Sequence, residues 1–121
     1  MRPLAPDLAF QELDTAELLA MVPCGTESVL RCGRAVVELG RRAADDPALL
    51  AEVAALIRDP AHTRLVTIGP VSVSQLGTAG LVAAGGEPTT ALARELAAEW
   101  PPADQSDFAR LMTSSGVAWP R

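Results

Sequence analysis

The chain has 121 residues, the size of one domain, and its 49% hydrophobic and 21% charged content is ordinary for a globular core. A formal charge of −5 argues against a general nucleic-acid binder, because such a protein needs a basic face to displace counterions from phosphates. No run reaches the roughly 18 apolar residues that span a bilayer, and Pro3, Pro6 and Asp7 interrupt any signal-peptide core. We therefore expect a cytoplasmic protein without nucleic-acid or membrane partners.

Aromatic residues make up only 3% of the chain, so the core must consist mainly of Leu, Val, Ala and Ile. Such a core buries little area per residue, and association into oligomers is one way to bury more. Cys24 and Cys32 are the only cysteines. In a reducing cytosol we expect both to be small buried apolar residues.

Helix-start patterns divide the first half of the chain. Asp14 with Glu17 forms a capping box, and the helix that follows is expected to end at Pro23. A long helix over 27–44 carries Gly33 and Gly40 on one apolar face. Each interior glycine costs about 1 kcal/mol relative to alanine. That cost predicts a close contact on this face, either with another helix of the chain or with a second subunit.

The next helix is expected to begin at Asp46 and Pro47, with an Asp cap and Pro at the first helical position. Its broad apolar stripe predicts the central core helix and consists of Leu49, Leu50, Val53, Leu56 and Ile57. Asp59 and Pro60 end this helix and can open one short turn through His62.

The pattern changes over 64–86, the stretch around which the chain is organised. In residues 64–68 and 71–74 the side-chain pattern alternates as it does between the two faces of a β-strand, and Gly69-Pro70 between them favours a turn. This pattern predicts a β-hairpin over about 64–74. Ser74 is expected to cap a small-residue helix over 75–84 that ends at Gly85-Gly86. Two more helices follow, from about 88 to 100 and from 104 to 115. The predicted fold is mainly α: one small helical domain over 1–121 with one short hairpin.

No standard metal or nucleotide motif is present. His62 is the only histidine, so no zinc cluster can be assembled, and the glycine-rich stretch lacks both the phosphate-loop ending and the dinucleotide spacing. His62 could in principle activate Ser72, Ser74 or Cys32, but no nucleophile elbow is found. A surface or capping role is expected for His62. We expect no cofactor and no bound metal, and the sequence assigns no catalytic residue.

Hydrogen-bonding side chains concentrate around the predicted hairpin. The candidate substrate-binding residues are His62, Arg64, Thr67, Ser72, Ser74 and Gln75. Polar groups in a buried region must be paired, so they can satisfy the hairpin and the helix start. Alternatively, they line a groove for a peptide or small ligand, and the hairpin edge could pair with an extended peptide.

In size, helical character and scarcity of motifs, the chain resembles the lysinoalanine-forming proteins of cinnamycin- and duramycin-type lanthipeptide pathways, with the similarity expected to concentrate in TIGPVSVSQLGTAG (residues 67–80). The resemblance implies a homodimer that binds a modified peptide and promotes the addition of its lysine to a dehydroalanine. The base is then a hydroxyaspartate of the peptide itself. Catalysis by positioning needs no classical catalytic residue, since fixing the reacting groups can lower the activation barrier by about 7–11 kcal/mol. The resemblance transfers no site residues.

Two other functions remain open at this point. The chain could be a non-enzymatic dimeric interaction or regulatory module, with an exposed partner surface formed by Arg31, Arg34, Arg41 and Arg42. It could also be a conventional hydrolase or transferase, which would have to use His62 or a carboxylate. An interaction module should bind a folded protein, whereas a peptide-processing protein should bind a short modified peptide.

Overall fold

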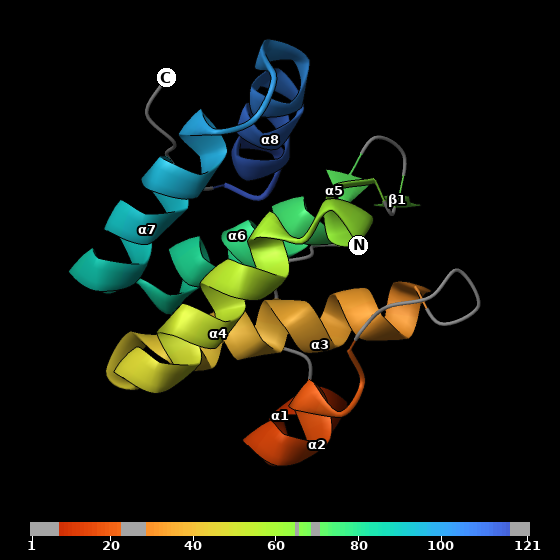
Figure 1. Ribbon diagram of the computed structural model, residues 1–121, viewed down its shortest axis with the longest axis vertical. Coiled ribbons are helices and arrows are strands. Elements are labelled where there is room, and N and C mark those ends of the chain that lie inside the picture. The colour runs from red at the N-terminus through yellow and green to blue at the C-terminus, as the bar shows by residue number, and fades with distance from the viewer. Residues whose placement is uncertain (1–7, 23–28, 65, 69–70, 117–121) are drawn as a thin grey trace.

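The computed structural model describes residues 8–22, 29–64, 66–68 and 71–116, and this part of the chain is mainly helical (Figure 1). The elements are α1 (Leu8–Gln11), α2 (Thr15–Leu19), α3 (Val29–Arg42), the 3₁₀ turn η2 (Ala43–Asp45), α4 (Pro47–Arg58), α5 (Pro60–Arg64), β1 (Val66–Ile68), β2 (Val71–Ser72), α6 (Val73–Ala84), α7 (Glu87–Ala98) and α8 (Pro102–Ser114). No helix in the described ranges is long and apolar enough to cross a membrane.

Helix α6 is the centre of the fold. All residues from Val73 to Leu81 are buried, and α6 packs against α3, α4 and α7. In Figure 1, α1 and α2 lie on the far side of α3, while α7 and α8 lie at the other end of the molecule. The prediction that α4 is the central helix was wrong. Its stripe is buried only at Leu49, Val53 and Ile57, because α4 covers one flank of α6 rather than being enclosed.

Glycines bring α3 and α6 into backbone contact. A Cβ atom on Gly40 would lie 2.8 Å from the Gly77 carbonyl oxygen and 2.9 Å from the Leu81 nitrogen. A Cβ atom on Gly80 would collide with the carbonyl oxygen of Val37. Cβ atoms essentially never approach backbone so closely, so only glycine fits at these two positions. The contact predicted for Gly40 is therefore made within the chain, to another helix.

Several predicted helix ends are confirmed. Asp14 accepts from the Glu17 amide while the Glu17 side chain accepts from the Asp14 amide, which completes the capping box of α2. Asp46 caps α4 at the Leu49 amide, and Gly85 ends α6 in the left-handed conformation at φ 77°. Helix α2 stops at Leu19, before the predicted end at Pro23, and residues 23–28, including the expected start of the next helix, lie outside the described residues.

The predicted hairpin differs from the structure at both ends. Arg64 is the last residue of α5, whereas Val73 and Ser74 belong to the first turn of α6. Between these helices β1 and β2 form a short antiparallel pair, Val66 with Ser72 and Ile68 with Val71, whose register is irregular. Residues 69–70, where the turn was predicted, lie outside the described residues. The second strand is short because Ser72, rather than Ser74, caps α6.

Arginines attach the N-terminal helices to α3. Arg42 donates to the carbonyl oxygens of Phe10 and Gln11, both at 3.2 Å, and its Nε donates to Glu38 at 2.9 Å. The Arg34 guanidinium lies over the Phe10 ring, 4.7 Å from the ring centre. Glu38 is buried, with Oε1 3.6 Å from the Nε of Arg41. The predicted exposed arginine surface was therefore wrong for Arg41 and Arg42, which are half-buried in these contacts.

The cysteine prediction was right about the burial of Cys32 but wrong about its redox state. Cys32 is disulfide-bonded rather than a free thiol, although it is buried as expected beside Val36 and Val73. The sequence contains one other cysteine, Cys24, which lies outside the described residues. The expectation relied on the redox state of the assumed compartment, which does not determine whether a particular cysteine is oxidised.

Candidate functional site: a hollow between α4, α5 and α7

The predicted polar residues at the start of α6 bond to the fold itself. The Ser72 hydroxyl accepts from the backbone N–H of Gln75, and Gln75 Oε1 accepts from the backbone N–H of Ser72. Gln75 Nε2 donates to the backbone carbonyl oxygen of Asp104 at 3.0 Å. The buried Ser74 hydroxyl donates to the Ile57 carbonyl oxygen at 2.7 Å. These bonds join the start of α6 to α4 and α8. They correspond to the alternative in which the polar groups satisfy the helix start.

His62 is a capping residue, as predicted, but it is buried rather than on the surface. Its side chain is about 1% exposed, and Nδ1 lies 2.8 Å from the carbonyl oxygen of Leu56 in the last turn of α4. Because a carbonyl oxygen only accepts, Nδ1 carries the proton. Arg64 is exposed at the end of α5, and Thr67 lies in β1 with its side chain outside the described residues. The structure thus brings His62, Ser74 and the end of α4 together, inside the protein.

A different feature is open to the surface. A hollow of about 240 Å³ lies where α4, α5 and the end of α7 meet, lined by Ile57, Arg58, Thr63, Leu96, Glu99 and Trp100. It is smaller than the roughly 300–1,000 Å³ of typical small-molecule sites. Its size suits one side chain of a larger ligand.

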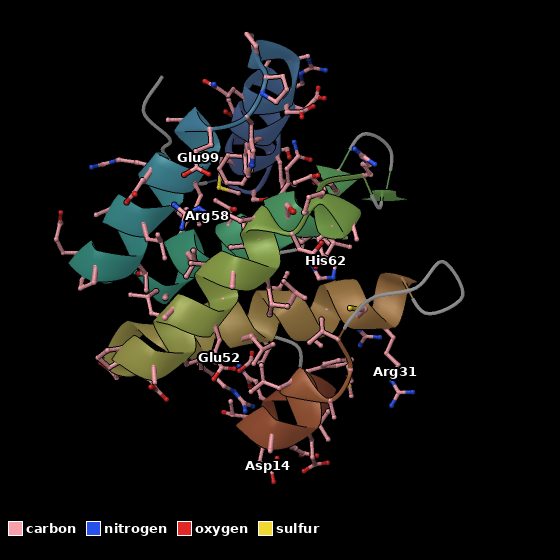
Figure 2. All side chains as sticks on the ribbon, viewed as in Figure 1. Asp14, Arg31, Glu52, Arg58, His62 and Glu99 are labelled. Carbon is pink, nitrogen blue, oxygen red and sulfur yellow. The ribbon has the colours of Figure 1, made fainter. Side chains whose placement is uncertain are left out.

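A charge pair forms the rim of the hollow. Arg58 Nη2 donates to Glu99 Oε2 at 2.8 Å and its Nε lies 3.2 Å from Glu99 Oε1, while Glu95 Oε1 is 3.6 Å from Nη2 (Figure 2). The hydrogen bond from Arg58 lowers the pKa of the Glu99 carboxyl, and the same bond raises the pKa of Arg58. Glu99 therefore stays ionised to lower pH than an ordinary glutamate. One guanidinium faces two carboxylates, so the cluster of Arg58, Glu99 and the neighbouring Glu95, which does not line the hollow, has a net charge of −1.

The other lining groups are held by contacts outside the hollow. The Thr63 hydroxyl donates to the Pro60 carbonyl oxygen at 2.9 Å. The Trp100 ring meets Phe108 of α8 edge to face, with 5.3 Å between ring centres, and the Gln105 side chain donates to the Trp100 carbonyl oxygen. These contacts hold the half-exposed indole in place beside the apolar side chains of Ile57 and Leu96.

Sequence reasoning missed this site. Arg58 is the last residue of α4, whereas Glu95 lies in α7 and Glu99 caps its C-terminus, and the three residues form no sequence motif. The available signal was Trp100 itself, because an aromatic residue in a chain with 3% aromatics is an uncommon binding group. Within the described residues no group of three His, Cys, Asp or Glu side chains could hold a metal ion.

Comparison with protein-family models, with curated proteins and with solved structures found no match to this chain.

Proposed function

We propose that this protein binds a modified peptide and holds it in the conformation in which its lysine adds to a dehydroalanine, as the resemblance to lysinoalanine-forming proteins implies. The observation that carries the proposal is the hollow beside Arg58, Glu99 and Trp100, which is sized for one side chain and combines apolar lining with charge. Such a site can anchor a peptide at one residue and fix the direction of its chain.

The reaction needs little from the protein beyond positioning. The lysine nitrogen forms a bond to the β-carbon of dehydroalanine, the carbon–carbon double bond opens, and the proton released by the amine reaches the α-carbon. The product is an isomer of the precursor, and the peptide's own hydroxyaspartate is the base in this proposal. Holding both groups in one geometry removes much of the entropic cost of bringing them together.

Native mass spectrometry of the protein with a dehydroalanine-containing cinnamycin-type precursor tests this function. We expect the peptide to be retained and to convert to a product of the same mass with a different chromatographic retention. Because the addition is isomeric, the crosslink itself is identified by resistance to thiol addition at the former dehydroalanine. A precursor that is neither retained nor converted contradicts the proposal.

A matched pair of variants tests whether the hollow is the site. Thr63→Phe places a bulky neutral ring in the lining of the hollow, whereas Ala61→Phe adds the same ring at an exposed position of the same short helix. We expect Thr63→Phe to lose retention of the precursor and Ala61→Phe to keep it. Equal retention by both variants would place the peptide elsewhere on the protein.

The proposal includes a cytoplasmic homodimer, as the same resemblance implies. A disulfide is unusual in a reducing compartment, so the bond at Cys32 makes the location testable. Acid quenching of cells followed by alkylation and intact-mass measurement gives the thiol state directly. Free thiols are expected for a cytoplasmic pool, and full oxidation would contradict the proposed location without bearing on peptide binding.

A further inference from the structure

We infer that the hollow is a subsite for a cationic side chain on an aliphatic stem, and that Glu99 accepts this cation in exchange for Arg58. The inference deepens the peptide-binding function proposed above and rests on it. It names the chemical class of the residue that enters the hollow and the carboxylate that selects it.

The first support is the charge at the rim. The Arg58 guanidinium contacts Glu99 through two nitrogens and approaches Glu95 to 3.6 Å, so the internal cation already occupies a position that two carboxylates favour. An incoming cation that displaces Arg58 from Glu99 finds an ionised acceptor, whereas an incoming anion meets Glu95 and Glu99. The rim therefore favours a positive group over a negative one.

The second support is the apolar lining. Ile57 and Leu96 can cover a chain of methylene groups, and the half-exposed Trp100 adds an aromatic ring in the same hollow. A cation within about 6 Å of an indole ring is attracted by the negative face of the ring. Long cationic side chains typically bury their aliphatic stems and leave the charge at a wet rim, which is the arrangement that these lining groups provide.

The third support is that replacing Arg58 by a ligand cation at Glu99 costs little free energy. The Arg58 side chain is 44% exposed and that of Glu99 is 47% exposed, so their pair is well solvated. Exposed ion pairs contribute little to stability because water screens them. Water can therefore solvate the released Arg58 guanidinium, and the net charge near the hollow changes from −1 to 0 when a ligand cation enters.

Two small probes isolate the charge from the rest of the peptide. Nα-acetyl-lysine methylamide carries the ammonium group, and Nα-acetyl-norleucine methylamide has a similar apolar stem without it. Titration is followed by the indole N–H resonance of Trp100, assigned with Trp119→Phe because Trp119 is the only other tryptophan. We expect the lysine probe to shift this resonance and the norleucine probe to bind at least about threefold more weakly.

Four variants make the test specific. Glu99→Gln should weaken binding of the lysine probe about two- to fivefold, and Arg58→Gln, which removes the internal competitor, should strengthen it by a similar factor. Glu52→Gln and Arg94→Gln change the net charge by the same amounts at exposed positions outside the hollow (Glu52 is labelled in Figure 2). Both controls should leave the affinity within error of the unchanged protein.

The decisive result is that Glu99→Gln and Arg58→Gln change the affinity for the lysine probe in opposite directions. Glu99→Gln and Arg58→Gln break the same ion pair, so a purely structural role would change both affinities in the same direction. Weaker binding by Arg58→Gln, unchanged binding by Glu99→Gln, or equal binding of the two probes would each overturn the inference. Thermal melting of every variant confirms that the folded proteins are being compared.

This test fails separately from the test of the proposed function. A protein that binds the lysine probe with these signs but neither retains nor converts the precursor keeps the subsite and loses the lanthipeptide function. If the protein converts the precursor but Glu99→Gln does not change the affinity for the lysine probe, the proposed function stands and the subsite is disproved.

Discussion

At the scale of single residues, Ser74 and Gln75 illustrate how groups suited to a ligand can serve the fold instead. Both are buried, and their side chains join the start of α6 to α4 and α8 through backbone carbonyl oxygens. A hydroxyl that pairs with a buried carbonyl stabilises the protein by more than its own bond, because the carbonyl would otherwise lose its partner. Substitutions at these positions should therefore change stability before they change binding.

Ser74→Ala should destabilise the protein by about 1–3 kcal/mol, because it leaves the Ile57 carbonyl oxygen without this donor. Urea denaturation measures the loss, with Ser106→Ala, at an exposed position of α8, as the control expected to change stability by less than about 0.5 kcal/mol. The folded variant should bind the lysine probe as the unchanged protein does. A selective loss of binding with normal stability would restore Ser74 as a ligand-binding residue.

At the scale of elements, the contact between α3 and α6 decides the packing of the centre. Gly40 on α3 and Gly80 on α6 remove side chains where the two backbones meet, so the helices approach more closely than ordinary side chains allow. Residues 73–81 are buried as a consequence. This contact tolerates no added volume, because backbone atoms are the neighbours on both sides.

Gly40→Ala should destabilise the protein by about 1–3 kcal/mol through overpacking, although alanine is ordinarily the better helix former by about 1 kcal/mol. Gly86→Ala is the matched control. A Cβ atom there has its nearest neighbour at 3.6 Å, so we expect a change of less than about 1 kcal/mol. Denaturant midpoints measure both, and a stabilised Gly40→Ala protein would show that α3 and α6 are not in backbone contact.

Arg42 gives a second prediction at this scale. Its guanidinium holds the end of α1 through the Phe10 and Gln11 carbonyl oxygens, so Arg42→Gln should release α1 and α2 while the rest of the fold persists. Hydrogen exchange should accelerate in residues 10–19 and stay unchanged in α7 and α8. Arg31→Gln removes an exposed arginine from the same helix and should leave all these rates unchanged. Uniform acceleration across the chain would contradict local release.

Local patterns predicted some elements well. Asp14 with Glu17, Asp46 with Pro47, and Gly85 each mark a helix end through contacts within a few residues, which a sequence displays directly. The start of α6 was displaced by two residues because Ser72 and Ser74 are both good caps, and only the position of Gln75 distinguishes them. The hollow depends on residues about 40 positions apart, Arg58 and Glu99, whose meeting is set by how α4 and α7 pack. No local pattern contains that information.

At the scale of the whole molecule, the core is small and has few aromatic residues. The free energy of unfolding of such a protein depends strongly on covalent crosslinks such as a disulfide. Cys32 is disulfide-bonded, and such a crosslink restricts the unfolded chain. Disulfides typically contribute about 2–4 kcal/mol to stability. That is a large part of the roughly 5–15 kcal/mol by which domains are stable.

Reduction should therefore lower the free energy of unfolding of the protein by about 2–4 kcal/mol. Urea denaturation with and without dithiothreitol measures this change. The double variant Cys24→Ser, Cys32→Ser should be as unstable as the reduced protein and should not respond to the reductant. Identical denaturation curves for the oxidised and reduced forms would show that the bond contributes nothing to folding.

The backbone contact between α3 and α6 also has a consequence for motion. Two helices that meet through glycines cannot slide by one residue, because the shift would drive a Cβ atom of one helix into the peptide groups of the other. The pair can move only as a rigid body. The elements that line the hollow, α4, α5 and the end of α7, lie outside this contact, so an adjustment that admits a ligand does not require α3 to slide along α6.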